Sequence, residues 1–575
     1  MLKIYKNLKP FIPYLLGILL FQTAQTIANL YLPTLTSDIT NNGIMKSDVP
    51  YIWRVGGEML LVAAGGVVCA IIASFMGSRT AMGLGRILRS KVFRNVETFS
   101  LHEFDKFGAS TLITRTTNDV VQIQMTTTII FNMMVSAPIT VIGGTILAFN
   151  QDKGLTVIIA AAIPLIAALI AFFAVKGIPL FKMVQAKLDK VNLVVRENLT
   201  GIRVIRAFNR IDSEEARFDK SSRDLAYTYI RVNRIMALMM PSMMLIMNLV
   251  TLSIIWFGAK KVGAGDSNIG NLMAFMQYAM QIMISLVMLT VMFIMIPRAQ
   301  AAAERISEVL AVKPDIKDPD VIKHANAEAG YVEFRNVSFR YQGAEKPVIS
   351  EISFSAKPGE TTAIVGGTGS GKSTIVNLIP RFYDADDGEI LIDGVNVREL
   401  SQQELRAKIG FVPQKSVLFT GTITENIQYG KSQATDEEIH QAAEISQADG
   451  FINDMNDSYS TMLSEGGLNL SGGQKQRLSI ARALVRRPEI YVFDDSFSAL
   501  DFKTDALLRA ALKKETDNAT VIIVAQRVGT VMDADRIIVL DEGKIAGIGT
   551  HKELMSSCEI YREIVSSQLS EEELA

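Results

Sequence analysis

The sequence holds few of the residues that build metal clusters or disulfide frameworks. It has only two cysteines, Cys69 and Cys558, and four histidines among 575 residues. The cysteines are far apart in the chain, which excludes a small disulfide-stapled scaffold and fits a reducing compartment for the soluble part. The net charge is −1. No overall positive charge therefore favours nucleic acid, and we expect no nucleic-acid partner.

Charged residues are also sparse, and apolar residues gather in the first half of the chain. Charged residues make up 20% of the sequence, hydrophobic residues 49%, and the mean hydropathy is +0.24. A hydrocarbon core of about 30 Å needs about 20 helical residues, so apolar runs of that length predict membrane spans. We expect six spans, at residues 11–32, 57–78, 129–149, 154–176, 235–258 and 272–296. So many uncharged runs in succession argue against six core helices of a soluble protein.

The loops between these runs differ in charge, which predicts the side of the membrane on which each lies. Residues 79–126 and 177–234 are long and rich in Lys and Arg, whereas residues 33–56, 150–153 and 259–271 are short and hold few. By the positive-inside rule, both long loops and both termini lie in the cytoplasm. No small-residue cleavage site follows the first run, so we interpret it as a span and not as a signal peptide. These features predict a multi-pass protein of the plasma membrane, in contact with lipid.

The second half of the chain has a pattern typical of a soluble α/β domain. From residue 331, short β-rich runs alternate with amphipathic helices. We predict a transmembrane domain over residues 1–310, a linker over 311–330 and a nucleotide-binding domain over 331–575. The predicted fold is a membrane α-helical bundle of six transmembrane helices fused to an α/β P-loop domain.

A phosphate-binding loop stands near the start of this α/β domain. Residues 366–373 fit G-x-x-x-x-G-K-[ST], between a strand-like run at 362–365 and a helix that opens at Thr374. The glycines let backbone N–H groups surround phosphates, Lys372 reaches the outer phosphates, and the Ser373 hydroxyl can ligate Mg²⁺. The predicted nucleotide-binding residues of this loop are Gly366, Gly367, Thr368, Gly369, Ser370, Gly371, Lys372, Ser373 and Thr374.

Two further stretches narrow the class of P-loop protein. A buried-strand run at 490–493 ends in Asp494, which is placed to hold Mg²⁺ directly or through water. Residues 470–474, Leu-Ser-Gly-Gly-Gln, precede it. With these motifs the chain resembles an ATP-binding cassette (ABC) transporter. The resemblance covers nearly all of residues 331–560, and a different P-loop NTPase is the alternative.

Other positions match this family's pattern in its order along the chain. Gln414 stands in the Q-loop position, Tyr341 in that of the A-loop aromatic, and Asp501 in the D-loop. The resemblance implies ATP and Mg²⁺ as ligands, with Tyr341 stacked on adenine and Gln414 also sensing the membrane domain. It implies that Mg²⁺ would be held by Ser373, Gln414 and Asp494. It also implies that two cassettes enclose two ATP molecules head to tail, so that each signature stretch contacts the ATP on the partner's P-loop. The implied ATP-binding set is completed by Ser471, Gly472, Gly473, Gln474 and Asp501.

Two positions depart from the pattern of catalytically competent cassettes. Asp495 stands where the family carries Glu, and its side chain is one methylene shorter for polarising the attacking water. Gln526 stands where a switch histidine is usual, and an amide can contact a γ-phosphate but cannot become a cation. Together with Gln414, these are the predicted catalytic residues. We interpret this chain's own site as one that binds ATP and hydrolyses it slowly, as in one subunit of a heterodimeric exporter with a degenerate site. The alternative is a slow homodimer that uses Asp495.

The membrane half resembles the exporter-type transmembrane domain of this family. Residues 104–119 and 197–208 resemble its two cytoplasmic loops, each expected to end in a short helix that docks on a cassette. The half-size architecture implies a second, different half-transporter as partner. Methionines on one face of the fifth and sixth spans, and few charges deep in the spans, favour an amphipathic or apolar small molecule as substrate.

The predicted function is therefore ATP-driven, multidrug-type efflux. Three alternatives remain open from the sequence. The same fold could serve an importer of metal chelates, or an exporter of lipid or peptide. A protein that binds ATP to regulate a partner, and moves nothing, is the third.

Overall fold

The computed structural model describes residues 2–324 and 330–568, and their contacts form two compact units. Unit 1 comprises Met1–Glu97 and Ala109–Val312, and unit 2 comprises Thr98–Gly108 and Lys313–Ala575. The short segment Thr98–Gly108 thus belongs by its contacts to unit 2, although it lies within the membrane half of the sequence. Part of the predicted linker, residues 325–329, lies outside the described residues.

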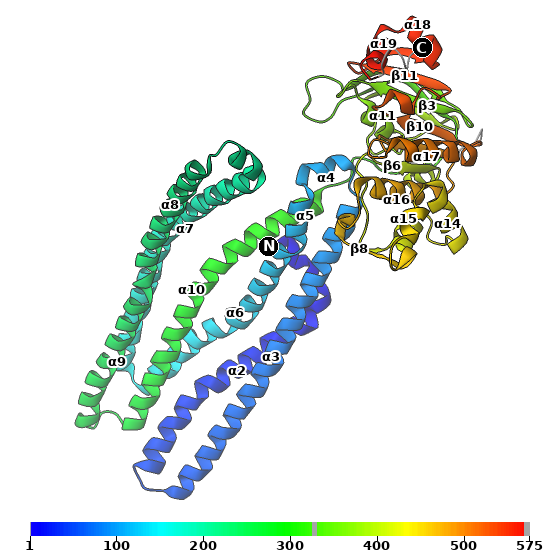
Figure 1. The fold of residues 1–575 in the computed structure, drawn as a ribbon. Coiled ribbons are helices and arrows are strands. Elements are labelled where there is room, and N and C mark those ends of the chain that lie inside the picture. Colours follow the sequence, from blue (N-terminus) through cyan, green and yellow to red (C-terminus); the bar gives the residue numbers. More distant parts are fainter. Residues whose placement is uncertain (1, 325–329, 569–575) are drawn as a thin grey trace. The chain divides into compact units, whose positions relative to one another are not determined.

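Unit 1 is built from long helices (Figure 1). Among the described residues, six helical stretches are long and apolar enough to cross a membrane, which confirms the predicted number. The long helices are α2 (Ile12–Asp38), α3 (Val49–Glu97), α6 (Asn118–Gln151), α7 (Lys153–Ala207), α8 (Ile211–Ala237), α9 (Met239–Ala264) and α10 (Ile269–Ala311). The shorter ones are α1 (Leu2–Tyr5), η1 (Lys6–Phe11), η2 (Ile39–Ile44) and α5 (Ala109–Thr116).

These helices pack in two groups that share one apolar core. Helices α2, α3, α6 and α10 run along one another, whereas α7 packs against α8 and α9 (Figure 1). Helix α10 joins the groups, because its buried Phe275, Tyr278 and Ile282 belong to a cluster that also includes residues of α2, α7 and α9. Between membrane-spanning helices, close packing of such side chains stabilises the bundle through van der Waals contact.

The helix boundaries differ from the predicted spans at two turns. Between α6 and α7 only Asp152 is non-helical, since its carboxylate caps α7 by accepting from Leu155 N at 2.9 Å and binds Lys261 Nζ at 2.6 Å. The predicted fifth span begins inside α8, and the helix is interrupted at Leu238 before α9 continues. Apolar composition continues through this interruption, so hydropathy alone could not reveal it.

The structure differs from one expectation at the second of the two loops predicted to be cytoplasmic. Instead of ending in a separate short helix, this loop continues α7 to Ala207 and turns directly into α8 at Ile211. Asn209 adopts a left-handed backbone conformation, φ 49°, and Arg210 N donates to Ile205 O at 2.9 Å. This hydrogen bond caps the end of α7, so the turn closes without a further helix. The first loop does contain a short helix, α4 (Leu101–Phe107), which lies in unit 2.

Unit 2 contains an antiparallel sheet and a mostly parallel sheet, which confirms the predicted α/β domain. The first has the order β2-β1-β4-β5 and the second β12-β11-β3-β10-β9-β6. The strands of the first sheet are β1 (Val332–Phe339), β2 (Ile349–Ala356), β4 (Asp387–Ile392) and β5 (Val395–Asn396). Those of the second are β3 (Thr361–Gly366), β6 (Ile409–Val412), β9 (Ile490–Asp494), β10 (Thr520–Val524), β11 (Arg536–Asp541) and β12 (Lys544–Gly549). A further pair joins β7 (Gly421–Thr422) to β8 (Met462–Leu463).

Both faces of the larger sheet are buried. Along β9, Ile490 and Val492 point into one apolar cluster while Tyr491 and Phe493 point into the other. This alternation is the two-residue period of a strand covered on both sides. The helices of the unit that carry or support the site are α11 (Lys372–Leu378), α12 (Gln402–Ala407), α13 (Ile423–Gln428), α14 (Asp436–Ile445), α16 (Gly472–Leu484), α17 (Phe502–Glu515) and α19 (Glu559–Ser566).

The strand order fixes where the site forms. β3, β10 and β9 are adjacent and parallel, so their carboxyl ends lie at one edge of the sheet. The P-loop follows β3, Asp494 ends β9, and Gln526 follows β10. Ligands in open parallel sheets bind outside these carboxyl ends.

Candidate nucleotide-binding site

The P-loop has a backbone that only glycine allows at its ends. Gly366 and Gly371 adopt φ values of 156° and 97°. A Cβ atom on Gly366 would lie 2.4 Å from Leu540 O, and one on Gly371 would lie 2.5 Å from Ile349 Cγ2. Both glycines are therefore required for the loop to leave β3 and enter α11 in this conformation. The N–H groups of the loop and of the first turn of α11 form the anion-binding end of a helix.

Lys372 and Ser373 lie at the start of α11, facing the end of β9. Lys372 Nζ donates to Gly366 O at 2.8 Å and to Gly367 O at 2.7 Å, so the ammonium lies over the loop. Burial lowers the pKa of Lys372 below its usual value. The negative charges of Asp495 and Asp494 raise it, and so oppose this shift. Ser373 Oγ donates to Asp494 Oδ1 at 3.0 Å.

The residues around Asp494 fit a magnesium ion. A hydroxyl and a carboxylate in hydrogen-bond contact form an oxygen donor set of the kind Mg²⁺ prefers. Burial raises the pKa of Asp494, although the Ser373 hydroxyl opposes the shift. Ser370 Oγ is buried and has no hydrogen-bond partner among the described residues. A nearby polar ligand would satisfy that hydroxyl.

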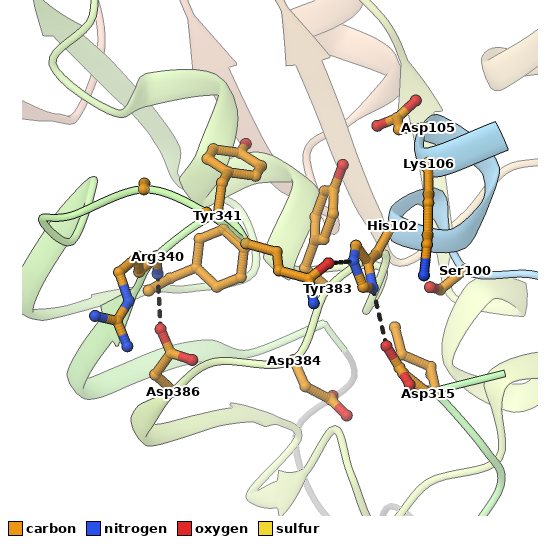
Figure 2. A pocket seen from close by; sticks show the side chains of 15 residues that line it. Ser100, His102, Asp105, Lys106, Asp315, Arg340, Tyr341, Tyr383, Asp384 and Asp386 are labelled. Atoms are coloured by element: carbon orange, nitrogen blue, oxygen red, sulfur yellow. Dashed lines mark hydrogen bonds and ion pairs between the residues drawn. The ribbon is translucent and has the colours of Figure 1, made fainter. Parts of the chain in front are cut away.

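Tyr341 lies beside the P-loop helix at the wall of a cavity of about 720 Å³. Its Oη is 3.2 Å from Thr374 Oγ1. Its ring meets that of Tyr383 edge-on, with 5.4 Å between the ring centroids (Figure 2). Burial raises the pKa of Tyr383 to about 12. Tyr383 was not among the predicted site residues, because no motif in the sequence connects it with Tyr341.

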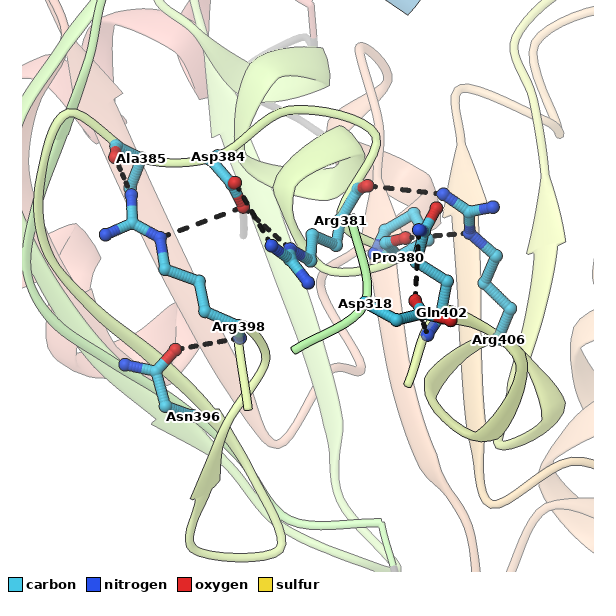
Figure 3. A network of polar contacts seen from close by, with 9 residues as sticks. All are labelled: Asp318, Pro380, Arg381, Asp384, Ala385, Asn396, Arg398, Gln402 and Arg406. Atoms are coloured by element: carbon cyan, nitrogen blue, oxygen red, sulfur yellow. Dashed lines mark hydrogen bonds and ion pairs between the residues drawn. The ribbon is translucent and has the colours of Figure 1, made fainter. Parts of the chain in front are cut away.

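Arginine side chains hold the loop that carries Tyr383 (Figure 3). Arg381 donates to both carboxylate oxygens of Asp384, at 2.8 and 3.2 Å. Arg406 donates to the carbonyl oxygens of Pro380 and Arg381, at 3.2 and 3.3 Å. Bidentate and charge-assisted contacts of this kind are among the stronger hydrogen bonds, so the loop presents Tyr383 to Tyr341 in a fixed orientation.

The three predicted catalytic residues meet at one carboxylate oxygen. Asp495 Oδ2 accepts from Gln526 Nε2 at 2.9 Å and from Gln414 Nε2 at 3.3 Å. Asp495 has 7% of its surface exposed and a left-handed φ of 49°. Its N–H donates to Val524 O at 2.9 Å, so the backbone here is fixed to β10. Both donors to the carboxylate are neutral amides, which cannot carry a proton away.

The signature stretch forms the N-terminus of α16. Ser471 Oγ accepts from Gln474 N at 3.3 Å, and Gln474 Oε1 accepts from Ser471 N at 2.8 Å. This reciprocal pair is a capping box, and Gly472 and Gly473 form the first turn of the helix. A Cβ atom on Gly473 would lie 3.0 Å from Ala499 O, so the small residue permits close approach of the D-loop. Asp501 caps α17 by accepting from Thr504 N at 2.9 Å.

The signature set and the P-loop set are separate within this chain. Among the described residues, no hydrogen bond joins Ser471, Gly472, Gly473 or Gln474 to Lys372, Ser373 or Asp494. The structure thus brings the residues predicted to bind phosphate and those predicted to activate water together at one sheet edge. Gly473 of the signature stretch lies against the D-loop, and Ser471 and Gln474 cap the helix that the stretch begins.

Three supporting residues were not found from the sequence. Gln476 Oε1 accepts from Ala499 N at 3.3 Å, which ties α16 to the D-loop. Arg527 Nη1 donates to Leu500 O at 3.3 Å, which ties the segment after β10 to the residue before Asp501. Gln568, after α19, donates to Gln526 O and accepts from Val528 N, both at 2.8 Å. Only the fold brings these residues to the site.

Comparisons with known proteins agree with this geometry. A family model described as ABC transporter transmembrane region matches residues 15–287, and one described as ABC transporter matches residues 349–498. An uncharacterized ABC transporter ATP-binding protein of Mycobacterium tuberculosis is 42% identical over 98% of this chain and 97% of its own length. The uncharacterized ABC transporter ATP-binding protein YfiB of Bacillus subtilis is 37% identical over 100% of this chain and 99% of its own length.

Two further matches concern proteins with more specific names. An ATP-dependent lipid A-core flippase of Pseudomonas fluorescens is 32% identical over 99% of this chain and 97% of its own length. The solved structure of a bacterial Atm1-family ABC exporter with ATP bound has a TM-score of 0.80 and 26% sequence identity. That match covers 98% of this chain and 99% of the other.

The fold and the site define a multi-pass membrane protein with a fused P-loop ATPase domain. The chain belongs to the ABC transporter family, as a half-transporter with the fold of an Atm1-family exporter. The predicted family and fold class are thereby confirmed, and with them an ATP-driven transporter.

Proposed function

We propose that this chain is one subunit of an exporter for amphipathic or hydrophobic compounds, and that its own ATP site is hydrolytically impaired. Its partner is a second, different half-transporter. The proposal of an impaired site rests on one observation: Oδ2 of Asp495 accepts hydrogen bonds from both Gln414 and Gln526.

A water-activating carboxylate must accept a hydrogen bond from the attacking water and take up its proton. At Asp495 two amide donors occupy one carboxylate oxygen, and the side chain is shorter than that of Glu. A displacement of about 1 Å between base and reacting atom is enough to lower a rate by about 100-fold. Gln526 adds no positive charge to the site, since an amide does not protonate near neutral pH.

In this proposal the chain retains every group that the family pattern uses to bind ATP. Lys372 and the loop amides hold the phosphates, and Tyr341 stacks on adenine. Ser373, Gln414 and Asp494 hold Mg²⁺, which neutralises phosphate charge when it is bound. This chain's site therefore retains ATP and turns it over slowly.

The separation of the signature stretch from the P-loop supports a composite site. Ser471 and Gly473 lie at a helix N-terminus, and among the described residues no hydrogen bond joins them to the P-loop residues of their own chain. An N-terminus of this kind favours a negatively charged ligand. In the proposed complex, this chain's signature stretch completes the ATP site on the partner's P-loop. At that site the partner supplies the glutamate and the histidine that this chain lacks.

The substrate class rests on the membrane helices. Of the methionines predicted to share one face of the fifth or sixth span, Met240, Met273 and Met280 are exposed, whereas Met243 and Met283 are buried in the apolar cluster. Methionine is flexible and polarisable, which suits a surface that accepts varied apolar molecules. Unit 2 and both termini lie in the cytoplasm in this proposal, and unit 1 lies in the plasma membrane.

A second candidate substrate is a lipid. The support is the 32% identity to a protein named ATP-dependent lipid A-core flippase over almost the whole chain. A flippase and an efflux exporter share the ATP chemistry proposed above and differ only in what the membrane helices bind.

Isolation of the intact complex from native membranes in mild detergent tests the partner. We expect an equimolar second half-transporter that carries Glu after the aspartate corresponding to Asp494, and a histidine at the position of Gln526. Recovery of this chain alone, with ATPase activity as a homodimer, would refute the division of labour. Reconstituted vesicles then separate the substrates, because a fluorescent amphipathic dye and a short-chain fluorescent lipid report efflux and lipid movement independently.

A further inference from the structure

The side-chain amide of Gln568 contacts the backbone of the segment that carries Gln526. Gln568 Nε2 donates to Gln526 O, and Gln568 Oε1 accepts from Val528 N, both at 2.8 Å. Gln568 lies just after α19, whereas the other two residues follow β10. The proposed chemistry gives Gln568 no role. One side chain thus makes two hydrogen bonds to a segment that is distant in the sequence.

The orientation of this amide follows from its two partners. A backbone carbonyl oxygen can only accept a hydrogen bond, and a backbone N–H can only donate one. Nε2 must therefore face Gln526 O, while Oε1 faces Val528 N. Rotation of the amide by 180° would place acceptor against acceptor and donor against donor. Only the observed orientation makes both hydrogen bonds.

Regular secondary structure is interrupted at the segment that Gln568 contacts. Strand β10 ends at Val524, and the short 3-10 helix η5 (Val528–Thr530) begins after Arg527. The first N–H groups of a helix have no acceptor within that helix. Val528 is buried, and a buried N–H without an acceptor is unfavourable. Gln568 supplies that acceptor, so the segment adopts a defined path between β10 and η5.

Helix α19 gives Gln568 a fixed position beside this segment. Tyr561 and Val565 of α19 have no exposed surface, and they belong to the same apolar cluster as Val528 and Val531. Gln568 N donates to Val565 O at 3.0 Å, so the last turn of the helix leads directly to the amide. The two hydrogen bonds of Gln568 therefore start from a packed part of the domain.

The backbone that Gln568 contacts carries the side chain of Gln526 to the nucleotide site. Gln526 Nε2 donates to Asp495 Oδ2 at 2.9 Å. Asp495 directly follows Asp494, whose Oδ1 accepts from Ser373 at the P-loop. Gln526 is itself exposed, so few neighbours pack against its side chain. The direction of its amide therefore depends on its backbone and on the hydrogen bond to Asp495.

We propose that Gln568 is a positioning residue that holds Gln526 toward the γ-phosphate of ATP, so that this chain's site distinguishes ATP from ADP. The proposal rests on the proposed ATP site of this chain, with Gln526 in contact with the γ-phosphate. An amide N–H is a suitable donor to a phosphate oxygen. ADP lacks the γ-phosphate, so the contribution of Gln568 is present for ATP and absent for ADP.

Photolabelling of the purified complex with 8-azido-ATP and with 8-azido-ADP tests this, since each label attaches to the chain that binds the base. Titrations with Mg²⁺ at low temperature give the affinity of this chain for each nucleotide. In Gln568→Leu, which removes both hydrogen bonds, the affinity for 8-azido-ATP should fall about three- to tenfold, the effect of losing one hydrogen bond. The affinity for 8-azido-ADP should not change. An equal loss for both nucleotides would indicate a merely structural role and overturn the proposal.

Gln568→Glu separates the two hydrogen bonds. Its carboxylate still accepts from Val528 N but cannot donate to Gln526 O. We expect this variant to lose affinity for 8-azido-ATP as Gln568→Leu does. Wild-type affinity in Gln568→Glu would mean that only the contact with Val528 matters, which overturns the proposal. Gln441→Leu is the matched control and should behave as wild type, because Gln441 is an exposed glutamine of the same unit that binds Arg487 instead.

Gln526→Ala tests the premise separately. Unchanged affinity for 8-azido-ATP in that variant would refute the contact of Gln526 with the γ-phosphate, whatever Gln568 does. If Gln526→Ala weakens 8-azido-ATP, then adding Gln568→Leu should weaken it no further, because both changes remove the same contact. Additive losses would mean that Gln568 acts by another route, and they would overturn the proposal. Wild-type affinity in Gln568→Leu, beside a loss in Gln526→Ala, would overturn it as well.

Discussion

The two regions of this ATP site lie at one sheet edge yet have different chemistry. The phosphate-binding region, residues 366–374 with Asp494, pairs an ammonium and a hydroxyl with carbonyl and carboxylate oxygens. The water-activating region consists of Gln414, Asp495 and Gln526, in which two amides share one carboxylate oxygen. Asp494 and Asp495 are neighbours in sequence. In the proposed function, binding and hydrolysis depend on these different groups, so that hydrolysis can be lost while binding is kept.

The backbone does not account for this difference. Asp494 ends β9, and the N–H of Asp495 donates to Val524 O on β10, so the sheet fixes both residues. The identity of the side chains at Asp495 and Gln526 is what departs from the competent pattern. Substitutions at these positions should therefore change the chemistry without unfolding the site.

The largest effect is expected in the phosphate-binding region. Lys372→Ala removes the charge that holds the outer phosphates, and hydrogen bonds to charged groups contribute about 1.5–3 kcal/mol, which corresponds to about 10- to 100-fold in affinity. Photolabelling of this chain by 8-azido-ATP measures the loss. Lys346→Ala, an exposed lysine in the same unit, should leave labelling unchanged. Equal labelling in both variants would contradict the assignment.

A large effect on turnover is expected from the signature stretch. Ser471→Ala should lower the ATPase rate of the complex about tenfold or more, because this residue would contact the ATP that the partner hydrolyses. It also removes the cap of α16, which lowers stability by about 1 kcal/mol. Thr435→Ala removes an equivalent capping box from α14. A similar loss of ATPase in Thr435→Ala would show that capping, and not contact with ATP, explains the result.

A gain is expected when the water-activating region is restored. In Asp495→Glu with Gln526→His, the longer carboxylate and a protonatable ring replace the two departures, and single-turnover hydrolysis on this chain should rise severalfold, up to about 100-fold. Radiolabelled ATP retained on this chain after a chase measures the rate. No change in either the double variant or its single-site versions would mean that other features limit hydrolysis here.

Asp495→Asn is expected to change little. If this carboxylate is already a poor base, the ATPase rate of the complex should fall by less than about twofold. The same change at the glutamate of the partner provides the comparison, and it should nearly abolish turnover. A collapse of activity in Asp495→Asn would place hydrolysis in this chain's own site.

The smallest effect is expected at the adenine end. Tyr341→Phe keeps the ring and removes the hydroxyl near Thr374, so affinity should weaken by about two- to fivefold, the value of one partly exposed hydrogen bond. Titration of 8-azido-ATP labelling measures this shift. Tyr341→Ala, which also removes the ring, should weaken labelling much more, and similar losses in both would mean that the ring does not stack on the base.

Much of the fold could be predicted because its signals are local. A run of about 20 apolar residues fits the thickness of a bilayer wherever it occurs, and the P-loop glycines are required by backbone geometry at Gly366 and Gly371. The break at Leu238 and the turn at Asn209 were not predicted, because composition does not change there. Helix ends depend on capping contacts that apolar periodicity does not encode.

The sequence by itself determined the number of membrane helices, the P-loop, the signature stretch and the two departures at Asp495 and Gln526. Only the tertiary structure decided which of these groups touch. The parallel order of β3, β10 and β9 brings Gln526 to Asp495, and α19 brings Gln568 to the backbone of Gln526. Motifs are short-range patterns, whereas a hydrogen bond between distant segments exists only after the strands and helices have packed. The contacts of Asp495 with Gln414 and Gln526 are of that second kind.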